Sequence, residues 1–257
     1  MYFVGIDVGL YSVKSVLVDE ERILLSRGVV SEEEGSKAAY RVFQEILKEG
    51  NIPEDEIASI VSTGMGRKEV AFANEKRTDQ VCIARGAYYL FPSARTVLDT
   101  GAGGCRAMKL GDHGKLIDFS SNSKCAGGTG SFLEAAARVL QLDVEGIDSL
   151  ALKAGSVSRV SSYCAVFAES EIISNIHRGF SKESICAGIC ESIAQRMHDV
   201  LRRVRIEKEV VLCGGVATNG TVVKMFEAEL DFPVLVPKDP LMVGALGAAI
   251  IARDLIR

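Results

Sequence analysis

The alternation of apolar and polar residues predicts two similar sets of strands, one at the start of the chain and one beginning near residue 97. The first set covers residues 5–9, 12–18 and 22–30. The second set covers residues 97–101, 105–110 and 115–120. Each set is typical of three antiparallel strands, and in each the first strand ends in an apolar-Asp-x-Gly turn. Repetition on this scale indicates a duplicated fold.

Helical periodicity follows each set of strands. In residues 36–48 the apolar positions Ala39, Val42, Phe43, Ile46 and Leu47 share one face. Further helices are predicted at 80–90, 130–140, 165–176, 184–204, 221–229 and 243–255, and further strands at 57–63, 209–213 and 233–236. This order predicts an α/β fold with mostly parallel sheets in two subdomains, residues 1–93 and 94–257, with a cleft between them.

Composition excludes several classes of partner. The 257 residues carry a formal net charge of −4, which gives no reason to expect nucleic acid or an anionic membrane. No apolar run approaches the length of a transmembrane helix, and the first residues lack the pattern of a signal peptide. A cytoplasmic location is therefore expected. The chain has seven cysteines, an odd number without the regular close spacing of a disulfide framework, so structural disulfides are not expected. The cysteines are then buried thiols or ligands of a metal ion or a cluster.

The two Asp-x-Gly turns suit a phosphate and a metal ion. Their glycines let backbone N–H groups approach phosphate oxygens, and a carboxylate at the strand end can hold Mg²⁺ directly or through water. Asp7 and Asp99 occupy duplicated positions, so they are predicted to face each other across the cleft. Lys14 is a candidate phosphate ligand, with a solvated lysine as the alternative. A simple turn is the alternative for either Asp-x-Gly in isolation.

Two further glycine-containing motifs lie in the second half. A predicted strand ends in Gly214-Gly215, a turn that would let the chain pass beneath a flat group such as adenine or its ribose. The small residues 244–249 are interpreted as helix packing that allows a close crossing.

Two cysteines lie at or just before predicted helix starts, where N–H groups and the helix dipole favour a thiolate. They are Cys125, in Lys-Cys-Ala-Gly-Gly-Thr-Gly, and Cys164, in Cys-Ala-Val-Phe-Ala-Glu-Ser-Glu. Two thiolates are half of the four that a cubane iron–sulfur cluster needs, which points to a symmetric dimer. Two small buried residues are the alternative. The residues 127–130 have N–H groups for either a phosphate or cluster sulfurs, while Cys105, Cys186 and Cys190 are predicted to be buried.

These motifs, in this order, resemble the superfamily of actin, sugar kinases and heat-shock chaperone ATPases. The resemblance narrows around residues 5–18, 63–67, 124–130, 162–173 and 214–219. There the chain is similar to the activator ATPases of 2-hydroxyacyl-CoA dehydratases and to the ATPase subunits of benzoyl-CoA reductases. The two cysteine motifs are the specific ones, because the phosphate motifs alone also fit a sugar kinase.

The resemblance implies duplicated ribonuclease H-like (actin-like ATPase) subdomains flanking a nucleotide cleft. It further implies a homodimer that functions under anaerobic conditions and has one [4Fe–4S] cluster, held by Cys125 and Cys164 of each chain. Asp7 and Asp99 would be the catalytic residues and would hold Mg²⁺. The binding and hydrolysis of ATP would drive the transfer of an electron, which ferredoxin or flavodoxin supplies, to a partner dehydratase or reductase. The candidate residues for ATP or ADP are Gly9, Ser12, Lys14, Gly101, Gly127, Gly128, Thr129, Gly130, Gly214, Gly215 and Asn219.

One departure from the family concerns hydrolysis. After Asp-x-Gly the family usually has Gly-Gln-Asp, whereas this chain has Ala102-Gly103-Gly104. If the missing side chains position water or Mg²⁺, hydrolysis here is slow, rearranged or lost. A nucleotide-gated iron–sulfur protein with little turnover is therefore one alternative function. A small-molecule, sugar-like kinase of the same superfamily is the other.

Overall fold

A computed structural model describes residues 1–30, 35–122, 129–160 and 165–256 of the chain. By its internal contacts the chain forms two units. The first unit combines residues 1–97, 108–118 and 237–257, and the second combines residues 98–107 and 119–236. The subdomains predicted from the sequence, residues 1–93 and 94–257, are the two copies of a duplicated fold. Because the two units are defined by contacts and not by duplication, these subdomain boundaries stay a prediction.

A five-stranded sheet with the order β3-β2-β1-β4-β5 forms the centre of the first unit. Its strands are β1 (Tyr2–Val8), β2 (Ser12–Val18), β3 (Ile23–Val30), β4 (Ile57–Gly64) and β5 (Glu75–Lys76). The first three strands pair antiparallel, as predicted, while β4 pairs parallel with β1 and β5 parallel with β4. The parallel pairing places the ends of β1 and β4 at one edge, which is where the Asp7 turn lies.

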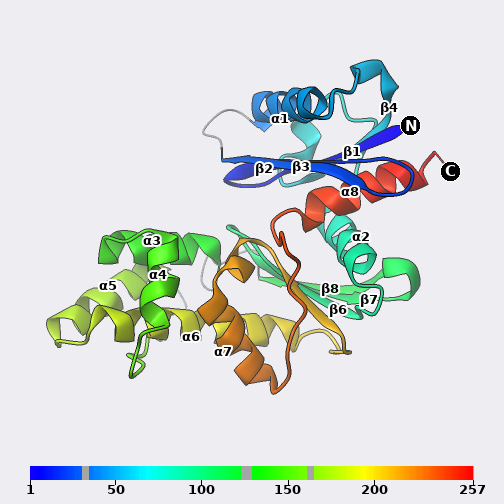
Figure 1. Cartoon of the computed structure of the whole chain (residues 1–257). Helices are drawn as coiled ribbons and strands as arrows, with labels where there is room; N and C mark the ends of the chain where they lie inside the picture. Colours follow the sequence, from blue (N-terminus) through cyan, green and yellow to red (C-terminus); the bar gives the residue numbers. More distant parts are fainter. Residues whose placement is uncertain (31–34, 123–128, 161–164, 257) are drawn as a thin grey trace. The chain divides into compact units, whose positions relative to one another are not determined.

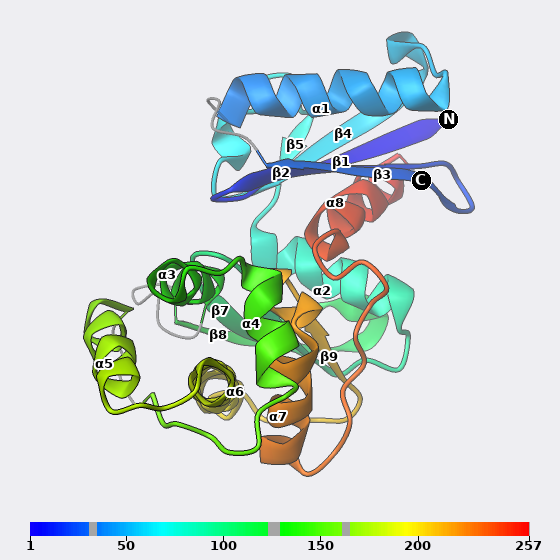
Figure 2. The ribbon, with the colours of Figure 1, turned by 60° about the vertical axis from the view of Figure 1, so that its left-hand side comes forward.

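Helices cover both faces of this sheet (Figures 1 and 2). They are α1 (Gly35–Gly50) on one face and α8 (Val243–Asp254) on the other, and α2 (Asp79–Leu90) packs against α8. All five apolar positions predicted for the first helix are buried, because α1 turns that stripe onto the sheet. The opposite face of β1 packs on α8, where the backbone of Ala245 and Ala249 leaves no room for a side chain at Gly5. Glycines also bring α2 and α8 close together, which confirms the predicted close crossing: a Cβ at Gly247 would overlap the carbonyl of Cys82.

The second sheet has the order β8-β7-β6-β9. Its strands are β6 (Thr96–Thr100), β7 (Cys105–Leu110), β8 (Leu116–Asn122) and β9 (Val210–Cys213). The strand predicted at 233–236 is wrong, since only Leu235 forms an isolated parallel bridge, with Val211. Pro233 and Pro237 bracket this segment, and neither has an N–H to extend a ladder.

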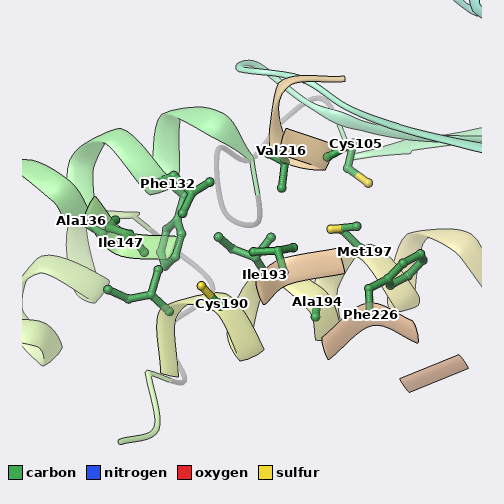
Figure 3. Close-up of a cluster of buried hydrophobic side chains, with 14 of the residues drawn as sticks. Cys105, Phe132, Ala136, Ile147, Cys190, Ile193, Ala194, Met197, Val216 and Phe226 are labelled. Carbon is green, nitrogen blue, oxygen red and sulfur yellow. The ribbon is translucent and has the colours of Figure 1, made fainter. Parts of the chain in front are cut away.

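Helices make up most of the second unit: α3 (Gly130–Leu140), α4 (Val144–Ala151), α5 (Ala165–His177), α6 (Lys182–Leu201) and α7 (Gly220–Leu230). Apolar side chains of α3, α4, α6 and α7 meet in one core, with Phe132, Ile147, Ile193 and Phe226 among them (Figure 3). Short 3₁₀ helices occur at Glu54–Glu56, Arg67–Glu69, Asp112–Gly114 and Gly215–Thr218. Among the described residues, no helix has the length and apolarity that crossing a membrane requires.

Candidate functional site

The first hairpin holds Asp7 beside a lysine. Asp7 lies one residue before the end of β1 and is in register with Lys14 of β2. The Lys14 Nζ lies 3.0 Å from the Asp7 Oδ2, and the two side chains are only 11% and 16% exposed. The Gly9 N–H donates to the Ser12 carbonyl at 3.0 Å and closes the turn. The structure therefore brings together Asp7, Gly9, Ser12 and Lys14, all of which the sequence predicts as site residues.

Two glycines that the sequence prediction missed border the Asp7 carboxylate. Gly64, at the end of β4, has a φ of +86°, and a Cβ there would press on the Asp7 Oδ1 and the Val8 carbonyl. A Cβ at Gly244, at the start of α8, would lie 3.2 Å from the Asp7 Oδ2. The signal for Gly64 was present in the sequence, because a strand that ends in Gly-x-Gly indicates a close backbone approach.

The second hairpin repeats the arrangement of the first. The Arg106 Nη1 on β7 lies 3.0 Å from the Oδ2 of Asp99 on β6, and the side chains are 14% and 11% exposed. A cation thus follows each aspartate by seven positions. Arg106 was not among the site residues predicted from the sequence, although the equal spacing of aspartate and cation in the two repeats indicates it. The Gly101 N–H donates to the Gly104 carbonyl at 2.9 Å and closes this turn.

The glycine turn after β9 lies against the Asp99 hairpin. Gly214 has a φ of +88°, and a Cβ there would lie 2.5 Å from the Thr100 carbonyl oxygen and 2.8 Å from the Asp99 Oδ1. Both the backbone conformation and this contact exclude a side chain. Gly215 follows in a 3₁₀ helix. Asn219 is buried and caps α7, its Oδ1 accepting from the Val222 N–H at 2.9 Å, while its contact with a nucleotide stays a prediction.

The start of α3 is bonded to the tip of the Asp99 hairpin. The Gly130 N–H donates to the Gly101 carbonyl at 3.0 Å. The Ala102 carbonyl accepts from both the N–H and the hydroxyl of Ser131, at 3.2 and 2.7 Å. Thr129, another predicted site residue, is fully buried next to this junction. Cys125, Gly127, Gly128 and Cys164 lie outside the described residues.

The five described cysteines have buried side chains. Burial is what the sequence predicts for Cys105, Cys186 and Cys190. Burial raises the pKa of the thiols of Cys82, Cys105 and Cys190 to about 12 and that of Cys186 to about 11. Cys213 is next to Asp99, so burial and the carboxylate together raise its pKa. The described residues contain no group of three or more His, Cys, Asp or Glu side chains that could hold a metal ion.

Comparison with known proteins shows the family of the chain. Residues 4–252 match the model of the BadF/BadG/BcrA/BcrD ATPase family. The chain belongs to this family. The resemblance stated from the sequence motifs is thereby confirmed. Among relatives of this ATPase family, the activator of lactoyl-CoA dehydratase from Anaerotignum propionicum is 38% identical over 254 residues, covering 99% of this chain and 98% of the relative.

Solved structures agree with this assignment. The activator of the 2-hydroxyisocaproyl-CoA dehydratase from Clostridium difficile, with bound ADPNP, is 34% identical, with a TM-score of 0.94 over 99% of this chain and 95% of that one. A ROK family glucokinase from Streptomyces griseus, in complex with glucose and AMPPNP, is 13% identical, with a TM-score of 0.60 over 99% and 100%. The second likeness shows the fold alone. Together they confirm the predicted class of this ATPase, an α/β fold with duplicated actin-like domains.

Proposed function

We propose that the protein is an ATP-dependent activator that passes single electrons to a partner dehydratase or reductase. A [4Fe–4S] cluster, one per homodimer, carries the electron, and ferredoxin or flavodoxin supplies it. The family and the activator names of the relatives support the ATP-dependent activator role. The protein acts in the cytoplasm of an anaerobic cell.

The observation that carries the proposal is the junction between α3 and the Asp99 hairpin. Three hydrogen bonds join Gly130 and Ser131 to the carbonyls of Gly101 and Ala102. The segment that contains Cys125 directly precedes this first turn of α3. A shift of the hairpin on nucleotide binding is therefore transmitted to the helix that follows the cluster ligand, a coupling of the kind expected for a two-state element.

The donor sets fit the groups that the proposal requires. Asp7 in the first unit and Asp99 in the second are each a candidate ligand for Mg²⁺, which needs few protein carboxylates because it keeps water and phosphate ligands. When bound, Mg²⁺ neutralises charge on the phosphates. Because the N–H groups of Gly9 and Gly101 already close the two turns, other backbone N–H groups of these turns would bind phosphate oxygens, with Lys14 as a cation beside the first turn. For the cluster, Cys125 and Cys164 of each chain are the ligands that the resemblance to the family implies, while the five described cysteines are buried.

The exposed side of α5 supports docking of a second protein surface. Phe167 is 70% exposed, and Ile173, Ile176 and Phe180 each expose more than 40% of their surface. Apolar groups of this size on one short segment are typical of protein contacts. Since α5 directly follows Cys164, this surface belongs to the part of the chain where dimer and partner contacts are expected.

Anaerobic purification tests the cluster. The expected result is a brown, oxygen-sensitive dimer with about four iron and four sulfide atoms. Cys125→Ser should lose the iron, and Cys186→Ala, which changes a buried thiol, should keep it. A colourless, iron-free monomer would refute the proposal.

The coupling has its own test. Ser131→Ala removes one hydrogen bond to Ala102 and should preserve iron content and ATP binding. It should weaken the change in the cluster's electron paramagnetic resonance signal on adding ATP. Ser149→Ala, on the exposed side of α4, is the matched control. Equal responses in the two variants would contradict the transmission through α3.

Gly103 and Gly104 favour a second candidate function, a nucleotide-gated cluster protein with little turnover. Neither residue provides a side chain to orient water. The double variant Gly103→Gln/Gly104→Asp should raise the ATPase rate sharply if those groups limit hydrolysis. An unchanged rate would count against this account, and phosphorylation of a small acceptor would favour a kinase instead.

A further inference from the structure

The two hairpins share one electrostatic arrangement. In each, an aspartate near the end of the first strand pairs with a cation seven residues later on the second strand. The nitrogen–oxygen distance is 3.0 Å in both pairs, Lys14–Asp7 and Arg106–Asp99. No side chain of either pair exposes more than 16% of its surface. The repeat therefore includes the cation as well as the Asp-x-Gly turn.

Stability alone is a weak explanation for these pairs. Removing two charges from water costs several kcal/mol per ion, and an apolar pair of similar size is often as stable. A buried pair next to glycine turns is better explained by a ligand that replaces part of the pairing. Such a ligand must be anionic to attract the cation, and it must fit beside backbone N–H groups.

The charged residues of the Asp99 hairpin indicate which side chain would attract such an anionic ligand. Residues 100–105 contain no charged side chain, and Gly103 and Gly104 contribute backbone only. The Asp99 carboxylate would repel a phosphate, so a compensating cation is needed close to it. Arg106 is the charge that this hairpin has for that purpose. A guanidinium also binds phosphate oxygens through two parallel N–H groups, which an ammonium cannot do.

We propose that Arg106 is a phosphate-binding residue, the counterpart of Lys14 in the second repeat. Its guanidinium pairs with Asp99 when no nucleotide is present and contacts the β-phosphate oxygens when ADP or ATP binds. The inference rests on the proposed nucleotide-binding function and adds to it the recognition of the phosphate group by a second cation. Arg106 thus contributes side-chain recognition where the family's Gln-Asp pair is missing.

The test measures binding of ADP and of adenosine to the anaerobically purified full chain by calorimetry, in EDTA so that Mg²⁺ does not contribute. Arg106→Gln should raise the Kd for ADP about 10- to 100-fold, the range for a charge-assisted hydrogen bond. The Kd for adenosine, which has no phosphate, should not change. Arg138→Gln on the exposed side of α3 is the control and should leave both unchanged.

The double variant Asp99→Asn/Arg106→Gln distinguishes binding of phosphate by Arg106 from neutralisation of the Asp99 charge by Arg106. If Arg106 only compensates the Asp99 charge, the double variant regains the wild-type Kd for ADP, and the inference is overturned. If Arg106 binds phosphate, ADP binding stays weak. Should Arg106→Gln not fold, Arg106→Lys serves, and it should weaken ADP binding without affecting adenosine.

The remaining outcomes separate the two proposals. A wild-type protein that binds neither ADP nor ATP overturns the proposed function. A wild-type protein that binds ADP, with an Arg106→Gln variant that binds it equally well, overturns only the role of Arg106. Equal weakening of ADP and adenosine also overturns it, because that pattern reports general damage to the site.

Discussion

Replacing Gly214 by alanine tests whether the turn after β9 holds the Asp99 hairpin in place. The residue has a φ of +88°, in the left-handed region that alanine avoids. Its added Cβ would lie 2.5 Å from the carbonyl oxygen of Thr100 and 2.8 Å from the Oδ1 of Asp99. Both distances are well inside ordinary van der Waals contact, so the hairpin or the turn must move.

The expected magnitude has two parts. Gly214 has a φ of 88° and a ψ of 173°, a conformation that is essentially confined to glycine and costs a residue with a Cβ about 1–3 kcal/mol. Forcing a methyl group into a packed site costs about 1–3 kcal/mol more. The Gly214→Ala variant should therefore lose about 2–6 kcal/mol in its free energy of unfolding. Because the clash includes Asp99, binding of ADP should weaken as well.

Two other glycines of the same unit allow the parts to be measured separately. Gly179 has a φ of +79°, and a Cβ added there would meet nothing within 4 Å, so Gly179→Ala tests backbone strain alone. Gly155 has neither a positive φ nor a close neighbour, and Gly155→Ala should be close to neutral. Urea unfolding followed by circular dichroism gives the three free energies, and calorimetry gives the Kd for ADP.

The order of the three variants is the decisive result. Gly155→Ala should be the most stable, then Gly179→Ala, then Gly214→Ala, and only the last should affect ADP binding. A Gly214→Ala variant as stable as Gly179→Ala would show that the contact with the Asp99 hairpin does not exist in solution. The account of Gly214 would then be wrong.

Three further predictions concern stability. Because the pKa of the Cys82 thiol is raised from 9.0 to about 12, the unfolded chain releases its proton first, so stability falls as pH rises between these values. Between about pH 10 and pH 11, the free energy of unfolding measured in urea should fall less steeply with pH for Cys82→Ala, by about 1.4 kcal/mol per pH unit. Asp148→Ala removes the acceptor for the N–H groups of Gly220 and Thr221 and should cost about 1–3 kcal/mol in thermal unfolding, and a neutral result would refute its capping role. Gly247→Ala should cost at least as much, because its Cβ overlaps the Cys82 carbonyl, and an unaltered melting temperature would contradict the close crossing of α2 and α8.

Local patterns were enough to predict most of the elements. The strands around Asp7 and Asp99 and the buried stripe of α1 follow from periods of two and 3.6 residues, which depend on neighbouring residues only. The helix α4 (Val144–Ala151) was missed because it is short, although Asp143 caps it. The 233–236 strand was predicted wrongly because an apolar run does not reveal how many ladder bonds its flanking prolines permit.

Contacts between distant segments were beyond the sequence. The approach of Gly214 to Asp99 joins residues more than a hundred positions apart, and the bond from Ser131 to Ala102 joins two predicted elements whose packing no periodicity specifies. The ion pair between Arg106 and Asp99 was within reach, since the strand register that creates it follows from the turn length. Site chemistry was thus predictable within each hairpin but not between hairpins and helices.

These contacts between segments explain why one hairpin can serve two purposes. Asp99 and Arg106 present charge at the strand ends, while the carbonyls of the same turn bind the start of α3. A ligand that draws Arg106 away from Asp99 acts on the backbone that also holds Ser131. In the two proposals, binding and transmission share the residues 99–106, so replacing Gly103 and Gly104 by larger residues should change both. For this reason a gain in ATPase rate at those glycines should be measured together with the response of the cluster, since a faster hydrolysis that no longer reaches α3 would uncouple the protein.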